Sequence, residues 1–98
     1  MDKKHRGAYN ELIATTFLLD LGYDVYRNVS AHGLADLVAI NFQTGERLLI
    51  DVKANSKFLK RDGSPTVLKI ILSKKQLEQG VRQLVVTSDN TCIWSEKE

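Results

Sequence analysis

The stretch that decides the fold is residues 34–53, LADLVAINFQTGERLLIDVK. Its two halves, 34–42 and 46–53, are rich in Leu, Ile and Val and have the length of strands, and Gln43-Thr44-Gly45 between them predicts a hairpin turn. Strands that are apolar on both sides are normally covered on both faces of a sheet. A charged side chain inside such a strand is costly unless it is paired or binds a metal ion.

Three charged residues stand inside this predicted hairpin. Asp36 lies in its first strand, and Asp51 and Lys53 lie in the second. Because residues i and i+2 of a strand share a face, Asp51 and Lys53 are expected to point to the same side. A symmetric turn, centred between Gln43 and Thr44, places Asp36 opposite Asp51, with Cβ atoms roughly 4.5–5.5 Å apart. A three-residue turn with a bulge at Gly45 shifts this register instead.

Two neighbouring carboxylates repel each other unless one is protonated or a cation lies between them. Mg²⁺ (or Mn²⁺) suits this position, because it prefers hard oxygen ligands and is often held by one or two carboxylates together with substrate phosphate. The backbone carbonyl of Val52 could add a further oxygen ligand. Lys53 could then orient or deprotonate a water, or stabilise charge on phosphoryl oxygens. The alternative is a simple ion pair between Lys53 and one of the aspartates, since Asp-x-Lys is a common tripeptide.

The rest of the chain predicts an α/β domain. A helix is expected over 7–21, where Tyr9, Leu12, Ile13, Thr16 and Phe17 recur at helical spacing and Gly22 follows. Further strands are expected at 23–29, 66–72, 84–87 and 91–94, and a short helix from Ser73 to Gln79. The order α-β-β-β-(β)-α-β-β indicates a mixed central sheet flanked by helices.

Composition bounds the class of protein. The 98 residues predict one domain spanning 1–98, and 43% hydrophobic with 27% charged residues argues against disorder. The chain has no long apolar run or leader-like stretch, so we expect a soluble cytoplasmic domain without membrane partners. Between Lys53 and Arg82 lie eight basic and two acidic residues. This segregation is typical of a surface that binds a polyanion, although a normally solvated surface can also carry it.

The arrangement resembles the PD-(D/E)xK nuclease superfamily. The match is Ala35-Asp36 and then Asp51-Val52-Lys53, preceded by a helix that carries Glu11 and followed by a short helix. Within the superfamily the chain is most similar to the small archaeal Holliday-junction resolvases, which share the helix ending seen in Leu21-Gly22-Tyr23-Asp24-Val25. It is also similar to the homing endonucleases of cyanobacterial introns. Two departures are Ala35 in place of proline and Asp51 in place of the commoner glutamate.

The resemblance implies a restriction-endonuclease-like fold and metal-dependent hydrolysis of DNA phosphodiester bonds that leaves a 5′-phosphate. Asp36 and Asp51 would be metal ligands and Lys53 the catalytic lysine. Glu11 matches a helix-borne acid that acts through water or a second metal. The alternative for Glu11 is a solvated position opposite the stripe that contains Ile13.

Several further residues are candidates for contacts with duplex or branched DNA. The resemblance places Ser30 and His32 near the scissile phosphate, although an exposed loop histidine is the commoner role. Gln76 occupies the place of a site glutamine found in some branches, but we expect a helix-surface amide. Phosphate contacts are expected from Lys57, Lys60 and Arg61. Cutting two strands suggests a homodimer. Two alternatives to a nuclease remain, a non-catalytic nucleic-acid-binding domain and a structural domain whose charges form ion pairs.

Overall fold

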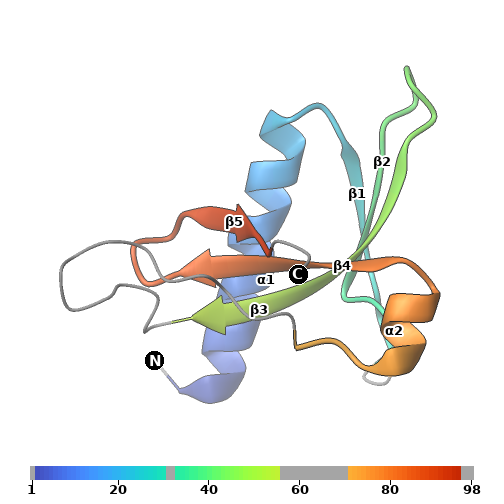
Figure 1. Ribbon diagram of the computed structural model, residues 1–98. Coiled ribbons are helices and arrows are strands. Elements are labelled where there is room, and N and C mark those ends of the chain that lie inside the picture. Colours follow the sequence, from blue (N-terminus) through green and yellow to red (C-terminus); the bar gives the residue numbers. More distant parts are fainter. Residues whose placement is uncertain (1, 31–32, 56–70, 96–98) are drawn as a thin grey trace, which may run out of the picture.

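The computed structural model describes residues 2–30, 33–55 and 71–95. Five strands form one sheet in the order β1-β2-β3-β4-β5, with α1 behind the sheet and α2 in front of it in the view of Figure 1. Strands β3 and β4 are parallel, and every other neighbouring pair is antiparallel. The protein is therefore an α/β domain with a mixed sheet, as expected. The elements are α1 (Lys3–Asp20), β1 (Asp24–Arg27), β2 (Leu37–Ile40), β3 (Arg47–Asn55), α2 (Lys74–Glu78), β4 (Val81–Thr87) and β5 (Cys92–Trp94).

Element bounds differ from the predictions at several ends. Helix α1 begins at Lys3 and not at residue 7, because the Asp2 side chain caps it by accepting from the His5 amide at 2.9 Å. It ends at Asp20, one residue before the predicted end, and Gly22 follows the C-cap Leu21 with a φ of +93°. Strands β1 and β2 are shorter than predicted, whereas β4 begins earlier. The strand predicted over 66–72 lies largely outside the described residues, and its last two positions are not in a strand.

The hairpin between β2 and β3 has the register that the symmetric turn predicts. Leu37 pairs with Ile50 and Ile40 pairs with Arg47. Gly45 closes the turn with a φ of +79° and donates its amide hydrogen to the carbonyl of Asn41 at 2.7 Å. The alternative register with a bulge is wrong. Because side chains alternate along both strands, this register fixes which of them meet on each face.

The core lies between α1 and one face of the sheet. Buried residues of α1, β2, β3 and β4 form it: Ala14, Leu18, Leu37, Ala39, Leu48, Ile50, Leu84 and Val86. The helix face that enters this core is centred on Ala14 and Leu18, and Leu12 of the predicted stripe is 63% exposed. The predicted stripe is therefore correct in part: Ile13 and Phe17 pack against the core, but the buried face is rotated away from Leu12. Small Ala14 sits against the sheet, and this turns Asn10 and Glu11 toward the sheet as well.

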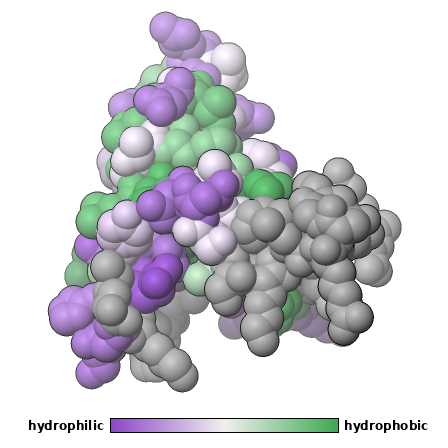
Figure 2. All heavy atoms as spheres, turned by 90° about the vertical axis from the view of Figure 1, so that its left-hand side faces the viewer, coloured by the Kyte–Doolittle hydropathy of each residue, from purple (hydrophilic) through white to green (hydrophobic). Residues whose placement is uncertain are grey.

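An open apolar groove of about 600 Å³ lies between α1 and β5. Its lining includes Leu12, Ile13 and Phe17 from α1 and Cys92 from β5. Figure 2 shows this side of the molecule, where hydrophobic surface (green) lies above hydrophilic surface (purple). Asp20 is the charged member of the described lining, so the groove does not suit a polyanion. Within the described ranges, no helix has both the length and the apolar character needed to cross a membrane.

Candidate active site

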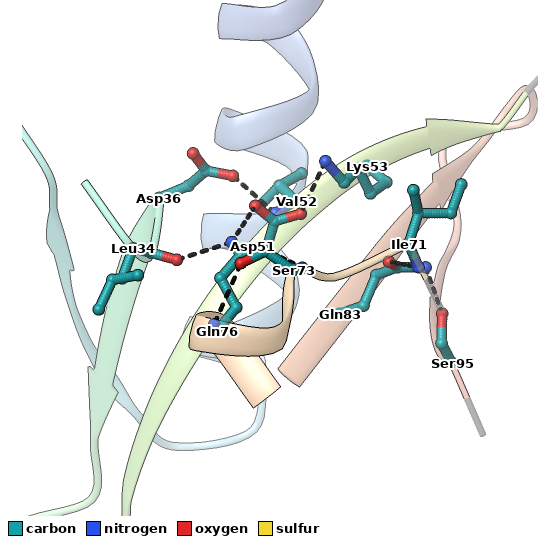
Figure 3. A network of polar contacts seen from close by, with 10 residues as sticks. All are labelled: Leu34, Asp36, Asp51, Val52, Lys53, Ile71, Ser73, Gln76, Gln83 and Ser95. Atoms are coloured by element: carbon teal, nitrogen blue, oxygen red, sulfur yellow. Dashed lines mark hydrogen bonds and ion pairs between the residues drawn. The ribbon is translucent and has the colours of Figure 1, made fainter. Parts of the chain in front are cut away.

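The site forms where the sheet forks. Strand β3 pairs with β2 as far as Ile50 but continues alongside β4 to Asn55. Beyond the fork the amide of Val52 needs a new acceptor, because a backbone N–H left unpaired in a protein interior is costly. Oδ2 of Asp36 supplies it at 2.7 Å (Figure 3). The Asp36 amide donates to the Ile50 carbonyl at 2.8 Å. The Asp36 carboxylate thus accepts the hydrogen bond that a backbone carbonyl of β2 would otherwise accept from β3. This contact holds it beside Asp51.

Asp51 and Lys53 share a face of β3, as the strand periodicity predicts. Lys53 Nζ lies 3.2 Å from Asp51 Oδ2, with the lysine side chain 40% and the aspartate side chain 11% exposed. This contact lacks the geometry of a hydrogen bond, and Asp51 Oδ2 accepts none from the described residues although it is buried. The ion pair that the sequence offered as an alternative therefore exists, but it gives Asp51 Oδ2 no hydrogen bond.

Gln76 of α2 holds the other oxygen of Asp51. Its Nε2 donates to Asp51 Oδ1 at 3.2 Å and to the Leu34 carbonyl at 2.8 Å. Its Oε1 accepts from the Ser73 amide at 2.9 Å within a capping box. The interpretation of Gln76 as a helix-surface amide is wrong. The sequence predicted a helix starting at Ser73 but not the role of Gln76 in its cap, and the contact with Asp51 depends on how the crossover places α2.

A cleft of about 570 Å³ brings the predicted acids together. It is lined by residues of α1, the start of β2 and the end of β3: Arg6, Gly7, Asn10, Glu11, Asp36, Asp51, Val52, Lys53 and Ala54. Glu11 therefore faces the cleft and is not a solvated residue of the opposite helix face. Its Oε1 lies 3.5 Å from Nε of Arg27 on β1. The three acids do not converge into one ligand cluster, since no group of three acids, histidines or cysteines in the described part is close enough to hold a metal.

The cleft carries excess negative charge. Burial raises the pKa of Asp36 above its ordinary value, and the nearby Asp51 carboxylate raises it further, against the opposing effects of the Val52 amide and Lys53. Burial likewise raises the pKa of Glu11, and Asp36 adds to the effect while Arg27 opposes it. Both shifts have the same cause, because carboxylates that are desolvated and close together lose stability in their charged forms.

The remaining predicted contacts lie away from this cleft or outside the described residues. Ser30 is exposed, and its amide donates to Oδ1 of Asn28 at 2.8 Å. It is not part of the cleft lining. Outside the described residues lie four candidates for DNA contacts: His32, Lys57, Lys60 and Arg61. Most of the predicted basic surface therefore stays a prediction. Comparison of the sequence with protein-family models and with curated proteins gave no match.

Proposed function

We propose that this protein is a divalent-metal-dependent endonuclease that hydrolyses DNA phosphodiester bonds and has a restriction-endonuclease-like fold of the PD-(D/E)xK type. The observation that carries the proposal is the fork of the sheet, which holds Asp36 against β3 beside Asp51 and Lys53. The same cleft receives Glu11 from α1. A mixed sheet with one helix on each side is in keeping with the proposed fold.

The donor set fits Mg²⁺ or Mn²⁺. Asp36 and Asp51 would hold the ion, because magnesium is typically bound through one or two carboxylates and keeps its other positions for water and phosphate. Two observations favour such an ion: Asp51 Oδ2 is buried without a hydrogen bond among the described residues, and the Asp36 pKa is raised by burial and by Asp51. When bound, the ion would act as a Lewis acid that activates water and neutralises charge on the phosphate.

The chain's own residues would position the reacting groups. Lys53 is half exposed to the cleft, and its ammonium group would orient a water or stabilise the negative charge that develops on phosphoryl oxygens. Gln76 would fix the orientation of Asp51 through Oδ1 and leave Oδ2 directed toward the lysine. Glu11, balanced by Arg27, would act at the opposite wall of the cleft through a water or a second ion.

The test is a cleavage assay with supercoiled plasmid, linear duplex, single strands and a four-way junction. Each substrate is incubated with Mg²⁺, Mn²⁺ or EDTA, and wild-type protein is compared with Asp51→Ala. We expect metal-dependent cutting that the substitution abolishes, and the preferred substrate distinguishes duplex from branched DNA. Salt-sensitive DNA binding without cutting would replace the proposal with a non-catalytic nucleic-acid-binding domain. Neither cutting nor binding would overturn every nucleic-acid function.

A further inference from the structure

The wall of the cleft opposite the aspartates is made by α1. Arg6 and Asn10 are four residues apart, so they lie one above the other on the same face of the helix. Both line the cleft together with Asp36, Asp51 and Lys53. Figure 2 shows hydrophilic surface (purple) in its lower part, at the height where α1 begins in Figure 1. Glu11 on this wall has a role in the mechanism proposed above, whereas Arg6 and Asn10 have none.

Asn10 is an unusual residue for the inner face of a helix. It is 5% exposed and shares that face with the core residues Ala14 and Leu18. Among the described residues, none exchanges a hydrogen bond with its side chain, although Asn10 lines the cleft. The amide atoms of Asn10 are not among the fully buried polar atoms without a partner, so they reach the solvent of the cleft. The amide therefore has the donors and the acceptor of a ligand-binding group that is satisfied when the cleft is filled.

Charge decides which ligand this wall takes. Arg6 forms no ion pair with any described residue and stands on the same wall as Asn10. A guanidinium group repels a metal ion but binds phosphate through two parallel hydrogen bonds. Glu11 on the same helix is paired with Arg27, so among the described residues the free charge beside Asn10 is that of Arg6. Arg6 and Asn10 thus favour an anion, whereas Asp36 and Asp51 favour a cation.

We infer that Arg6 and Asn10 bind a backbone phosphate of the nucleic-acid strand, next to the phosphate that is hydrolysed. Arg6 supplies the charge and Asn10 donates its amide hydrogens to a phosphoryl oxygen. This inference rests on the proposed function, because it takes the ligand of the cleft to be a phosphodiester chain. By this inference, Arg6 and Asn10 of α1 position the nucleic-acid strand where it crosses the metal site.

The experiment measures steady-state cleavage of whichever DNA the wild type cuts, with salt varied from about 50 to 200 mM. Arg6→Gln and Asn10→Ala are compared with wild type, and Arg47→Gln is the matched control, because Arg47 is exposed at the far end of β3. We expect about a tenfold rise in KM for each wall variant with little change in kcat. Arg6→Gln also lowers the slope of log(kcat/KM) against log salt by about 1. Arg47→Gln leaves both quantities unchanged.

Thermal unfolding separates binding from a structural role for Asn10. The Asn10 amide makes no hydrogen bond to a described residue, and alanine favours a helix more than asparagine does, so Asn10→Ala is expected to weaken DNA binding without a fall in Tm. A fall in Tm with unchanged KM would overturn the inference, as would wild-type KM values and salt slopes in both wall variants. Absence of cutting and binding by the wild type would overturn the proposed function itself and this inference with it.

Discussion

Gln76 and Asp51 are 25 residues apart in sequence, and the side-chain amide of one donates to the carboxylate of the other at 3.2 Å. The same nitrogen donates to the carbonyl of Leu34, and the amide oxygen accepts from the backbone of Ser73 (Figure 3). One carboxamide therefore joins the first turn of α2 to β3 and to the segment that leads into Asp36. The orientation of Asp51 depends on the docking of α2 as much as on its own strand.

Gln76→Glu tests this dependence. Glutamate still offers an oxygen to the Ser73 amide, so the capping box is kept. Both donated hydrogen bonds are lost, and a negative charge is placed beside Asp51. We expect kcat for DNA cleavage to fall roughly 10–100-fold, as is usual when a residue that orients a metal ligand is replaced. Steady-state cleavage and circular dichroism of the variant measure activity and folding together.

Ser73→Ala is the matched control, since it removes the cap but leaves the amide nitrogen of Gln76 in place. It should cost about 1 kcal/mol of unfolding free energy, the usual value of an N-cap, with kcat close to that of wild type. If Ser73→Ala lowered kcat as much as Gln76→Glu, the effect would belong to α2 as a whole and not to the contact with Asp51.

Asp51→Asn separates a metal ligand from a structural ion pair. Without metal we expect Tm to be unchanged or higher, because repulsion from Asp36 is relieved and an ion pair with a half-exposed lysine contributes only about 0–1 kcal/mol. At a metal concentration ten times Kd, binding adds about 1.4 kcal/mol to wild-type stability, or roughly 6–11 °C in Tm. The variant should lose this shift. A large fall in its metal-free Tm would instead assign Asp51 a structural role.

Lys53→Met is expected to lower the rate of DNA cleavage but to keep metal binding. A lysine that assists proton transfer or stabilises developing charge contributes roughly 10²–10⁴-fold to the rate. Loss of the ammonium group 3.2 Å from Asp51 Oδ2 should strengthen cation binding, so the metal-dependent rise in Tm should persist or grow. Lys75→Met on the exposed surface of α2 is the control for loss of one positive charge. Equal cleavage rates for the two variants would remove Lys53 from the mechanism.

The acid pair and its register could be predicted because they depend on short-range rules. Alternation along a strand puts Asp51 and Lys53 on one face, and the symmetric turn between β2 and β3 brings Asp36 next to them. Apolar strands with isolated charges marked the position in the sequence. The sequence did not reveal that the Asp36 side chain would accept from the Val52 amide, since this follows from the place where β2 leaves β3.

The contributions of the two helices were missed for a different reason. The rotation of α1 is set by its packing on the sheet, and Ala14 at the contact gives a weaker hydrophobic signal than Leu12, which is 63% exposed. Asn10 consequently faces the cleft although no pattern in the sequence marks it. Gln76 reaches Asp51 through a crossover between parallel strands, and sequence spacing cannot fix such a distance.

Gly33→Ala is expected to disturb the approach to Asp36. A Cβ at this position would overlap the side-chain amide of Asn28. That amide donates to the Ala35 carbonyl at 2.8 Å and accepts from the Ser30 amide at 2.8 Å. The Asn28 side chain must move and give up these two hydrogen bonds, so we expect a loss of about 1–3 kcal/mol in unfolding free energy, with reduced cleavage. Urea denaturation measures the loss.

The control for this substitution is Gly7→Ala, where a Cβ would meet no atom within 4 Å. Because Gly7 lies inside α1, alanine there should raise stability by roughly 0.5–1 kcal/mol. Equal effects of the two substitutions on stability would show that overlap with Asn28 is not the cause.

Asp89, in the turn between β4 and β5, should make stability depend on pH. Hydrogen bonds from the Thr87 and Thr91 hydroxyls lower the pKa of Asp89 below its ordinary value of 3.8. Since the folded state favours the carboxylate, its stabilising effect is complete above the unfolded pKa and is lost as pH falls through the lower folded value. Wild type should therefore have a higher Tm than Asp89→Asn above about pH 5, and this difference in Tm should disappear as pH falls below 3.8.

The measurement is circular dichroism melting across this pH range. Asp24→Asn, at an exposed site on β1, is the control. A difference that persists unchanged at low pH would show that the carboxylate charge is not the source of the stability.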